Sequence, residues 1–292
     1  MGSLPSPPQI TTPPSSPESS PSSYRVYAVQ APNSIDESDE FIDVGVEVLP
    51  SVLRHNVCSN QWSQSAPLGE PRYDFACAIC ENKIYVAGGK SSLASRRGIF
   101  LSRVYDPTLN AWSPLLGMST LRYESVGVTW RGKIQVVGGF AMRRDSDKTV
   151  PFITQRSSAE VYDPRTGKWD LVAGMWQLDV PPNQIVEVDG SLFSSGDCFK
   201  AWKDDNKENW PPTQRIYLTM APIGTRLYFL AGYRKAGESS RIMSMALIFD
   251  TTATRRAWAS SEPMEEEGVK ELCSHCCVVR ISETTVASEV TI

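Results

Sequence analysis

A repeat with fixed internal spacing constrains the fold of this chain more than any other feature. Its first copy runs from Arg72 to Trp112 and its second from Arg122 to Trp169. In both copies the arginine precedes a glycine pair by 16 positions, and a tyrosine precedes the tryptophan by 7. Only the segment between the glycines and the tyrosine changes length, and the additional residues fall in the polar stretch 140–157. A period of about 50 residues with one variable loop indicates a repeated structural unit.

Each copy is expected to form four antiparallel strands. Residues 75–80 and 83–87 are short apolar runs separated by the polar turn at residues 81–82. Two further runs flank a turn that contains Pro107. The glycine pair would end the second strand, where backbones approach closely, and the aromatic residues would fill the gaps between units. These structural markers are Gly88, Gly89, Tyr105 and Trp112 in the first copy, and Gly138, Gly139, Tyr162 and Trp169 in the second.

The rest of the chain is expected to contain weaker copies behind a disordered tail. Residues 1–23 are almost entirely Ser, Pro and Thr, which cannot bury enough apolar surface to fold. Residues 24–292 then form one domain. Its units are predicted at about 24–62, 72–112, 122–169, 180–212 and 217–258, with a partial unit at 271–292. Ser195-Gly196 and Ala231-Gly232 are expected to stand in for the glycine pair.

The order of double glycine, tyrosine and tryptophan resembles the kelch repeat. The sequences of Lys83–Gly89 and Ala159–Pro164 are similar to those of plant F-box/kelch-repeat proteins. The resemblance implies an all-β fold, a kelch-type β-propeller of about five to six blades whose ring is either closed or incomplete. It also implies a protein-binding module that recruits the substrate of a ubiquitin ligase. No F-box is visible before the first blade, so a contact with the ligase core requires an F-box elsewhere, and a truncated inactive relative is an alternative.

Composition excludes several other classes of protein. The 29 basic and 33 acidic residues are well mixed and give a net charge of −4, which argues against a nucleic-acid interface. The apolar runs are strand-sized, so no membrane span is expected. The N-terminus lacks the pattern of a signal peptide, and seven cysteines, an odd number, are interpreted as reduced thiols. A cytoplasmic or nuclear location is expected.

Two side-chain patterns are typical of metal sites. Cys77-x-x-Cys80 and Cys273-x-x-Cys276 suggest zinc, but residues three apart in a strand point to opposite faces, which favours buried thiols. Glu267, Glu271 and His275 are similar to an iron-binding pattern of plant kelch proteins that redirect glucosinolate breakdown, with Glu271 in place of aspartate. That iron enzyme is the alternative function. We expect no catalytic residue, cofactor or metal.

A binding surface is expected where the loops between second and third strands emerge beside the segments that join the blades. The residues predicted to contact a partner there are Arg72, Tyr73, Arg96, Arg97, Arg122, Tyr123, Arg143 and Arg144. Arginine and tyrosine are enriched at interaction hot spots. Because guanidinium groups pair with carboxylates and phosphates, the predicted partner is a protein with an acidic or phosphorylated segment.

Overall fold

The computed structural model describes residues 23–28, 50–56, 61–95, 97–143, 157–175, 184–198, 213–235, 242–253, 257–265, 276–281 and 289–291. The tail predicted for residues 1–23 lies outside this set, apart from Ser23. The described part is built from strands, with one short helix at residues 195–198. No helix among the described residues is long and apolar enough to cross a membrane.

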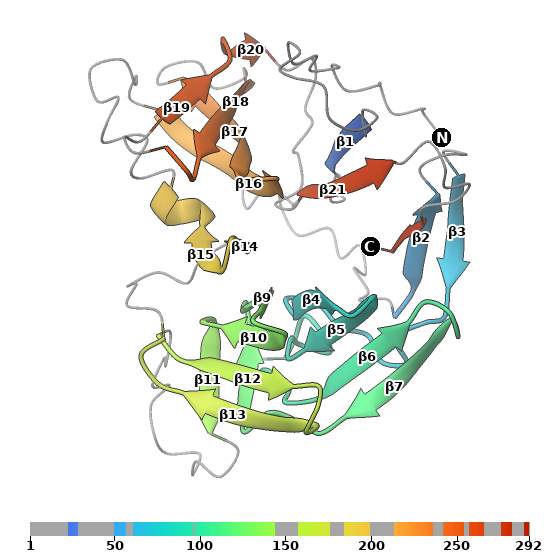
Figure 1. The fold of residues 1–292 in the computed structure, drawn as a ribbon. Coiled ribbons are helices and arrows are strands. Elements are labelled where there is room, and N and C mark those ends of the chain that lie inside the picture. The colour runs from blue at the N-terminus through green and yellow to red at the C-terminus, as the bar shows by residue number, and fades with distance from the viewer. Residues whose placement is uncertain are drawn as a thin grey trace.

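The strands form small antiparallel sheets arranged around a common centre as the blades of a propeller (Figure 1). The best-formed blade contains β4 (Ala76–Cys80), β5 (Lys83–Ala87), β6 (Ser102–Asp106) and β7 (Ala111–Leu115) in that order. Its neighbour contains β9 (Val126–Trp130), β10 (Lys133–Val137), β12 (Ala159–Asp163) and β13 (Lys168–Val172), with β8 (Thr120–Tyr123) paired to β11 (Phe140–Arg143). We call these two the β4–β7 blade and the β8–β13 blade. They confirm the all-β propeller predicted from the repeat.

The remaining sheets complete the arrangement. They consist of β14 (Ile185–Val188) with β15 (Ser191–Ser194); β16 (Thr213–Ile223), β17 (Arg226–Lys235), β18 (Ile242–Asp250), β19 (Ala257–Ser260) and β20 (Met264–Glu265); β1 (Ser23–Ala28) with β21 (Cys276–Ile281); and β22 (Glu289–Thr291) with β2 (Val52–Asn56) and β3 (Gln61–Ser65).

The chain reverses direction in tight turns whose residues adopt the backbone conformation that such turns require. Residues 81–82, 131–132 and 189–190 each connect the first two strands of a sheet, and all six have positive φ. Positive φ at both central residues defines a type I′ turn, whose twist matches that of the flanking strands. The turns thus fix the register of each inner hairpin.

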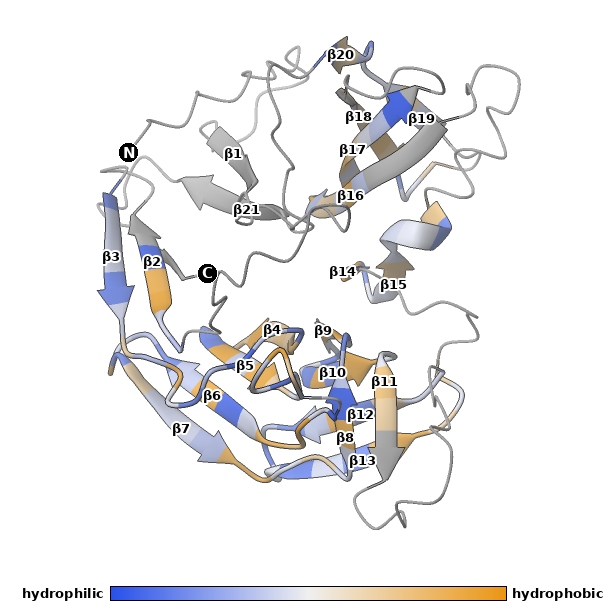
Figure 2. Ribbon diagram, turned by 180° about the vertical axis from the view of Figure 1, so that it is seen from behind, coloured by the Kyte–Doolittle hydropathy of each residue, from blue (hydrophilic) through white to orange (hydrophobic). Residues whose placement is uncertain are grey.

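The core lies between the blades. Alternate residues of β4 are buried, and Ala76, Ala78 and Cys80 pack with Ile134 and Val136 of the next blade. Hydrophobic colouring is strong along β4, β5 and β9 near the centre, whereas β7 and β13 at the outer rim carry more hydrophilic positions (Figure 2). Burial between inner strands therefore joins adjacent blades.

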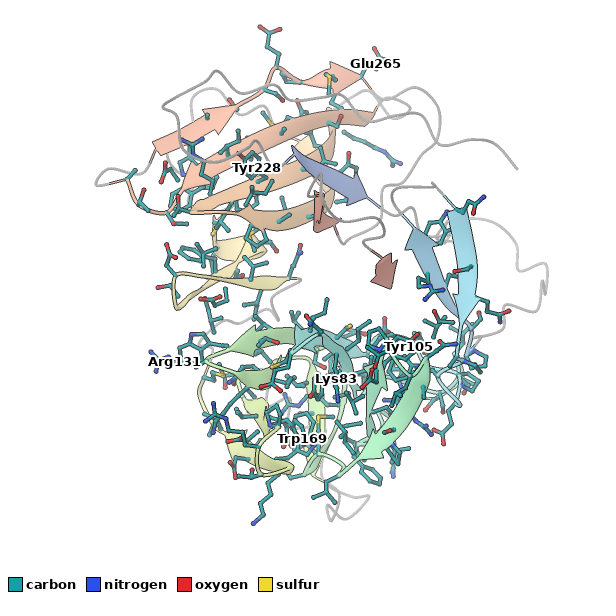
Figure 3. The ribbon with its side chains drawn as sticks, turned by 45° about the vertical axis from the view of Figure 1, so that its right-hand side comes forward. Lys83, Tyr105, Arg131, Trp169, Tyr228 and Glu265 are labelled. Carbon is teal, nitrogen blue, oxygen red and sulfur yellow. The ribbon has the colours of Figure 1, made fainter. Side chains whose placement is uncertain are left out.

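The tyrosine and tryptophan of each repeat pack against one another as tilted rings, and the tryptophan reaches the segment that follows the preceding blade. The ring centroids lie 5.0 Å apart for Tyr105 and Trp112, and 5.1 Å apart for Tyr162 and Trp169. Trp112 Nε1 donates a hydrogen bond to the carbonyl of Ala66 (2.9 Å). Trp169 Nε1 donates one to that of Leu116 (2.7 Å). Figure 3 shows Tyr105 and Trp169 among packed side chains, as expected for aromatic residues that fill the gaps between blades.

The glycine pairs allow a close approach of backbone to backbone. Gly88 has φ +71°, and a Cβ there would lie 2.4 Å from the carbonyl oxygen of Arg122. Gly139 has φ +72°, and its Cβ would lie 2.3 Å from the carbonyl oxygen of Tyr123. Neither the conformation nor the space admits a side chain.

The two substituted glycine pairs differ from the prediction. Ser195-Gly196 begins the helix at 195–198, and Gly196 does not have a positive φ. Ala231-Gly232 lies inside β17, which continues to Lys235. There a Cβ on Gly232 would meet the ring of Tyr217 at 2.0 Å. Alanine and serine do not readily adopt positive φ, so neither position forms the junction of a glycine pair: β15 is followed directly by the helix, and β17 continues.

Strands from the two ends of the chain pair with each other. β1 pairs with β21 over six residue pairs, and β2 pairs with β22 over three. The segment 24–62, predicted as one blade, is therefore divided between two sheets. β1 pairs with β21, while β2 and β3 form a sheet with β22. The strands β21 and β22 of the segment 271–292 thus pair with N-terminal strands, in two separate sheets.

Candidate functional site

The loop face is formed where the Arg-Tyr segments run beside the residues that follow each glycine pair. Tyr73 and Lys90 exchange backbone hydrogen bonds of 3.0 and 2.9 Å. In the next blade, Tyr123 is paired with Phe140 as β8 runs antiparallel to β11. These short ladders bring the predicted segments to the same side of the two blades.

Two of the predicted partner-binding residues lie in the interior, and this corrects the prediction for them. Arg72 is 4% exposed and Arg122 is fully buried. Arg72 Nη1 donates hydrogen bonds to the carbonyls of Gly88 (3.1 Å) and Leu101 (2.9 Å). Arg122 Nη1 donates to the equivalent carbonyls of Gly138 (2.6 Å) and Ser158 (3.1 Å). Both guanidinium groups hold the second strand to the third instead of facing a partner.

The sequence contained a signal for this role. The constant 16-residue separation between the arginine and the first glycine is the separation of the hydrogen-bonded groups themselves. A fixed distance along the chain between a charged residue and a glycine fits a side chain that binds a particular carbonyl better than a surface contact. Burial lowers the pKa of Arg72 and of Arg122 to about 10, so both remain cationic at neutral pH.

The other predicted arginines are only partly described. Arg97 is exposed, in the loop between β5 and β6. Arg143 is the last residue of β11, where it pairs with Thr120, and its side chain is not described. Arg96 and Arg144 lie outside the described residues.

The two predicted tyrosines meet at an aromatic cluster around Lys90. The Lys90 ammonium lies 4.0 Å from the ring centroid of Tyr123 and 5.7 Å from that of Tyr73. On its other side Tyr123 stacks on Phe140, with centroids 4.9 Å apart and an interplanar angle of 15°. All four side chains are half-buried. We call Tyr73, Lys90, Tyr123 and Phe140 the aromatic cluster.

Two exposed carboxylates flank the aromatic cluster, and sequence reasoning missed them. Asp74 and Glu124 follow the tyrosines and have φ of +54° and +52°. The backbone N–H of Glu124 donates to the carbonyl of Asp74 (2.9 Å), which links the two segments. Burial raises the pKa of Tyr73 and Tyr123, and both carboxylates add to this effect. The repeated order arginine, tyrosine, acid was the signal that could have identified them.

The candidate metal ligands are not brought together among the described residues. Cys77 is exposed and Cys80 is buried, as expected for positions three apart in a strand. Glu267, Glu271, Cys273 and His275 lie outside the described residues, and Cys276 is described only as part of β21. Within the described part of the chain, no group of three or more His, Cys, Asp or Glu side chains could hold a metal ion.

Comparisons with known proteins match the two repeats. The Kelch motif family model matches residues 71–119 and 121–175. An F-box/kelch-repeat protein of Arabidopsis thaliana is 36% identical over 141 residues, which cover 48% of this chain and 34% of the relative. A second one is 22% identical over 255 residues, or 86% of this chain and 58% of the relative. Kelch-like protein 23 of Homo sapiens is 29% identical over 124 residues, or 42% of this chain and 19% of the relative.

The chain thus matches only about a third of the first of these relatives. The two matched motifs coincide with the β4–β7 and β8–β13 blades, which share the buried arginine, the glycine pair and the packed tyrosine–tryptophan pair. The chain thus contains two kelch motifs and is similar over part of its length to the plant F-box/kelch-repeat proteins.

Proposed function

We propose that this propeller is a protein-binding module without catalytic activity, and that its loop face is the binding surface. The observation that carries the proposal is the aromatic cluster: two tyrosines, a phenylalanine and a lysine held half-buried on paired backbone segments. Large, rigid rings lose little conformational freedom on binding, and such residues dominate the energies of protein interfaces. Loops on a rigid scaffold are the usual location of binding residues.

The biological role we propose is recognition of the substrate of a ubiquitin ligase of the F-box/kelch type. Its support is the similarity of the two motifs to proteins named F-box/kelch-repeat proteins. The propeller would hold the substrate, and an F-box, wherever it is supplied, would contact the ligase core.

The partner we propose has an acidic or phosphorylated segment. Arg97 and Lys90 supply positive charge on the loop face, and Arg96, Arg143 and Arg144 belong to the same loops in the sequence. Asp74 and Glu124 oppose this charge locally, so the basic contacts are expected on the longer loops rather than beside the tyrosines. Clustered positive charge speeds the encounter with an acidic partner, and salt reduces this effect.

The test is capture of partners from a lysate with two variants of the loop face. One variant carries Tyr73→Ala and Tyr123→Ala. The other replaces Arg96, Arg97, Arg143 and Arg144 with glutamate. Loss of the same captured protein in both variants is the expected result, with an unchanged melting curve for the arginine variant and a cooperative melting transition retained by the tyrosine variant.

The control must reverse charge on the opposite face without disturbing the fold. Lys83 and Lys133 are unsuitable because they pair with Asp106 (3.2 Å) and Asp163 (3.0 Å). Arg165 and Lys168 are exposed in and beside the turn between β12 and β13, so Arg165→Glu with Lys168→Glu is the matched control. If the control loses the partner and both loop-face variants keep it, the binding surface is on the other face.

A further inference from the structure

The two well-formed blades differ in what surrounds their buried arginine. In the β8–β13 blade, Arg122 Nε donates to Thr120 Oγ1 (3.3 Å) and Nη2 donates to Ser158 Oγ (2.8 Å). Glu160 is fully buried, and its Oε1 accepts hydrogen bonds from Thr120 Oγ1 (2.8 Å) and Ser119 Oγ (2.7 Å). The buried cation therefore has a nearby carboxylate and hydroxyl acceptors.

The β4–β7 blade has replaced every one of these partners. The equivalent positions are Gly69 for Ser119, Glu70 for Thr120, Leu101 for Ser158 and Arg103 for Glu160. Nε and Nη2 of Arg72 are buried and have no hydrogen-bond acceptor among the described residues. A buried charged donor without an acceptor is costly, because it has lost its hydration.

A second guanidinium group stands where the first blade would need a carboxylate. Arg103 is half-buried, and its guanidinium nitrogens lie 3.3 and 3.4 Å from the point that a Cβ on Gly69 would occupy. Burial lowers the pKa of Arg72, Glu70 opposes that shift, and Arg103 adds to it. The positive charge of Arg103 thus disfavours the charged form of Arg72 at the place where the β4–β7 blade meets the segment that precedes it.

We propose that Arg72 and Arg103 form a subsite for an oxyanion, a carboxylate or a phosphate group. The proposal follows from the N–H groups of Arg72 that lack acceptors and from the guanidinium group of Arg103, which lies against Gly69, three residues before Arg72, where the absence of a side chain leaves room for it. Guanidinium groups bind carboxylate and phosphate through paired hydrogen bonds. Arg103 presents the open side of the subsite, and the exposed Glu70 is the competing anion supplied by the chain itself.

The subsite can be tested without a partner, by thermal unfolding in inorganic phosphate. The melting temperature is measured with phosphate and with chloride at equal ionic strength, and then with acetate to represent a carboxylate. At a ligand concentration about ten times the dissociation constant, binding is expected to raise the melting temperature by about 3 °C.

The decisive variant is Arg103→Glu, which gives the β4–β7 blade the charge arrangement of its neighbour. It is expected to abolish the phosphate shift and to melt higher than the wild type in chloride, because Arg72 then has a carboxylate beside it. Arg103→Gln, which keeps the size of the side chain, is expected to weaken the shift. Arg165→Glu on the opposite face should retain it. Glu70→Ala should enlarge it, because the competing carboxylate is gone.

A wild-type protein that melts at the same temperature in phosphate and chloride overturns the subsite. An Arg103→Glu variant with the wild-type phosphate shift does the same. If the oxyanion belongs to the protein partner, the subsite serves the proposed function. This link rests on that function, and capture of the partner by the Arg103→Glu variant tests it separately. If the Arg103→Glu variant no longer captures the partner, the subsite takes part in partner binding. If the variant loses the phosphate shift but still captures the partner, the subsite stands and its role in partner binding is refuted.

Discussion

At the scale of single residues, the fold depends on charged side chains inside the blades. Arg122 joins two carbonyls on adjacent strands, and Thr120 lies between its Nε and the carboxylate of Glu160. Such a group contributes little net free energy relative to a well-packed apolar residue, but removal of one member leaves the other charge unpaired. The arginine is therefore a structural requirement of its blade.

The first prediction concerns that pair. Arg122→Met should lower the free energy of unfolding by about 3–5 kcal/mol, because it leaves the Glu160 carboxylate buried without a cation. Arg97→Met should change it by less than about 0.5 kcal/mol, because Arg97 is exposed. Urea denaturation measures both. Arg122→Met with Glu160→Gln should recover part of the loss, and a double variant less stable than the sum of the single changes would contradict the pairing.

The second prediction concerns a thiol near the centre of the ring. Solvent reaches the surface of Cys77 on the inner strand β4, but the surrounding protein raises its thiol pKa to about 11 by desolvation. Only the thiolate reacts, so alkylation by iodoacetamide at pH 8 should be slow and should accelerate about tenfold per pH unit up to about pH 10. Peptide mapping after timed labelling measures this. Labelling at pH 8 as fast as that of free cysteine would show that the thiol is not desolvated.

At the scale of secondary-structure elements, each blade depends on a strand that stops at its glycines. Gly89 N donates to the carbonyl of Arg122 (2.7 Å), so the end of β5 is bonded to the segment that begins the next blade. In the sheet of β16–β20, where alanine replaces the first glycine, β17 continues through both positions to Lys235. The glycine pair thus coincides with the end of a strand in the two well-formed blades, and its replacement coincides with a strand that continues.

The third prediction compares two glycines with the same backbone. Gly88 and Gly190 have φ of +71° and +76°, but a Cβ would touch the Arg122 carbonyl only at Gly88, and nothing lies within 4 Å at Gly190. Gly190→Ala should therefore cost about 1–2 kcal/mol of conformational strain. Gly88→Ala should cost about 3 kcal/mol or more, because the neighbouring backbone must also move. Equal denaturation midpoints would mean that the junction has room for a side chain.

At the scale of the whole molecule, strands distant in sequence close the arrangement of blades. β1 and β21 are joined by six residue pairs, and β2 and β22 by three (Figure 1). Contacts of such long range cost loop-closure entropy before they contribute, so they are expected to form late in folding. They place the two ends of the chain in one ring.

The fourth prediction tests this closure by truncation. Deletion of residues 1–22 should leave the melting temperature unchanged, because β1 begins at Ser23. Deletion of residues 1–28 removes the partner of β21 and should lower the melting temperature by at least about 5 °C. Differential scanning calorimetry of both proteins checks this. If the protein that lacks residues 1–28 has the same melting temperature as the full chain, β1 does not stabilise the ring.

The sequence by itself determined the repeat, the hairpins and the aromatic contacts between blades. Turn residues and alternating apolar positions act locally, so β4–β7 could be placed within one or two residues. Only the tertiary structure showed that Arg72 and Arg122 are buried, because the constant spacing of 16 residues to the glycine indicates a fixed contact but not which side chains surround the guanidinium group. It alone paired β1 with β21 and β2 with β22, because pairing across the whole chain leaves no local pattern in the sequence. Turn residues and apolar alternation determine the strands, because they act between neighbouring residues. Side-chain burial and the pairing of terminal strands depend on residues that are distant in the sequence.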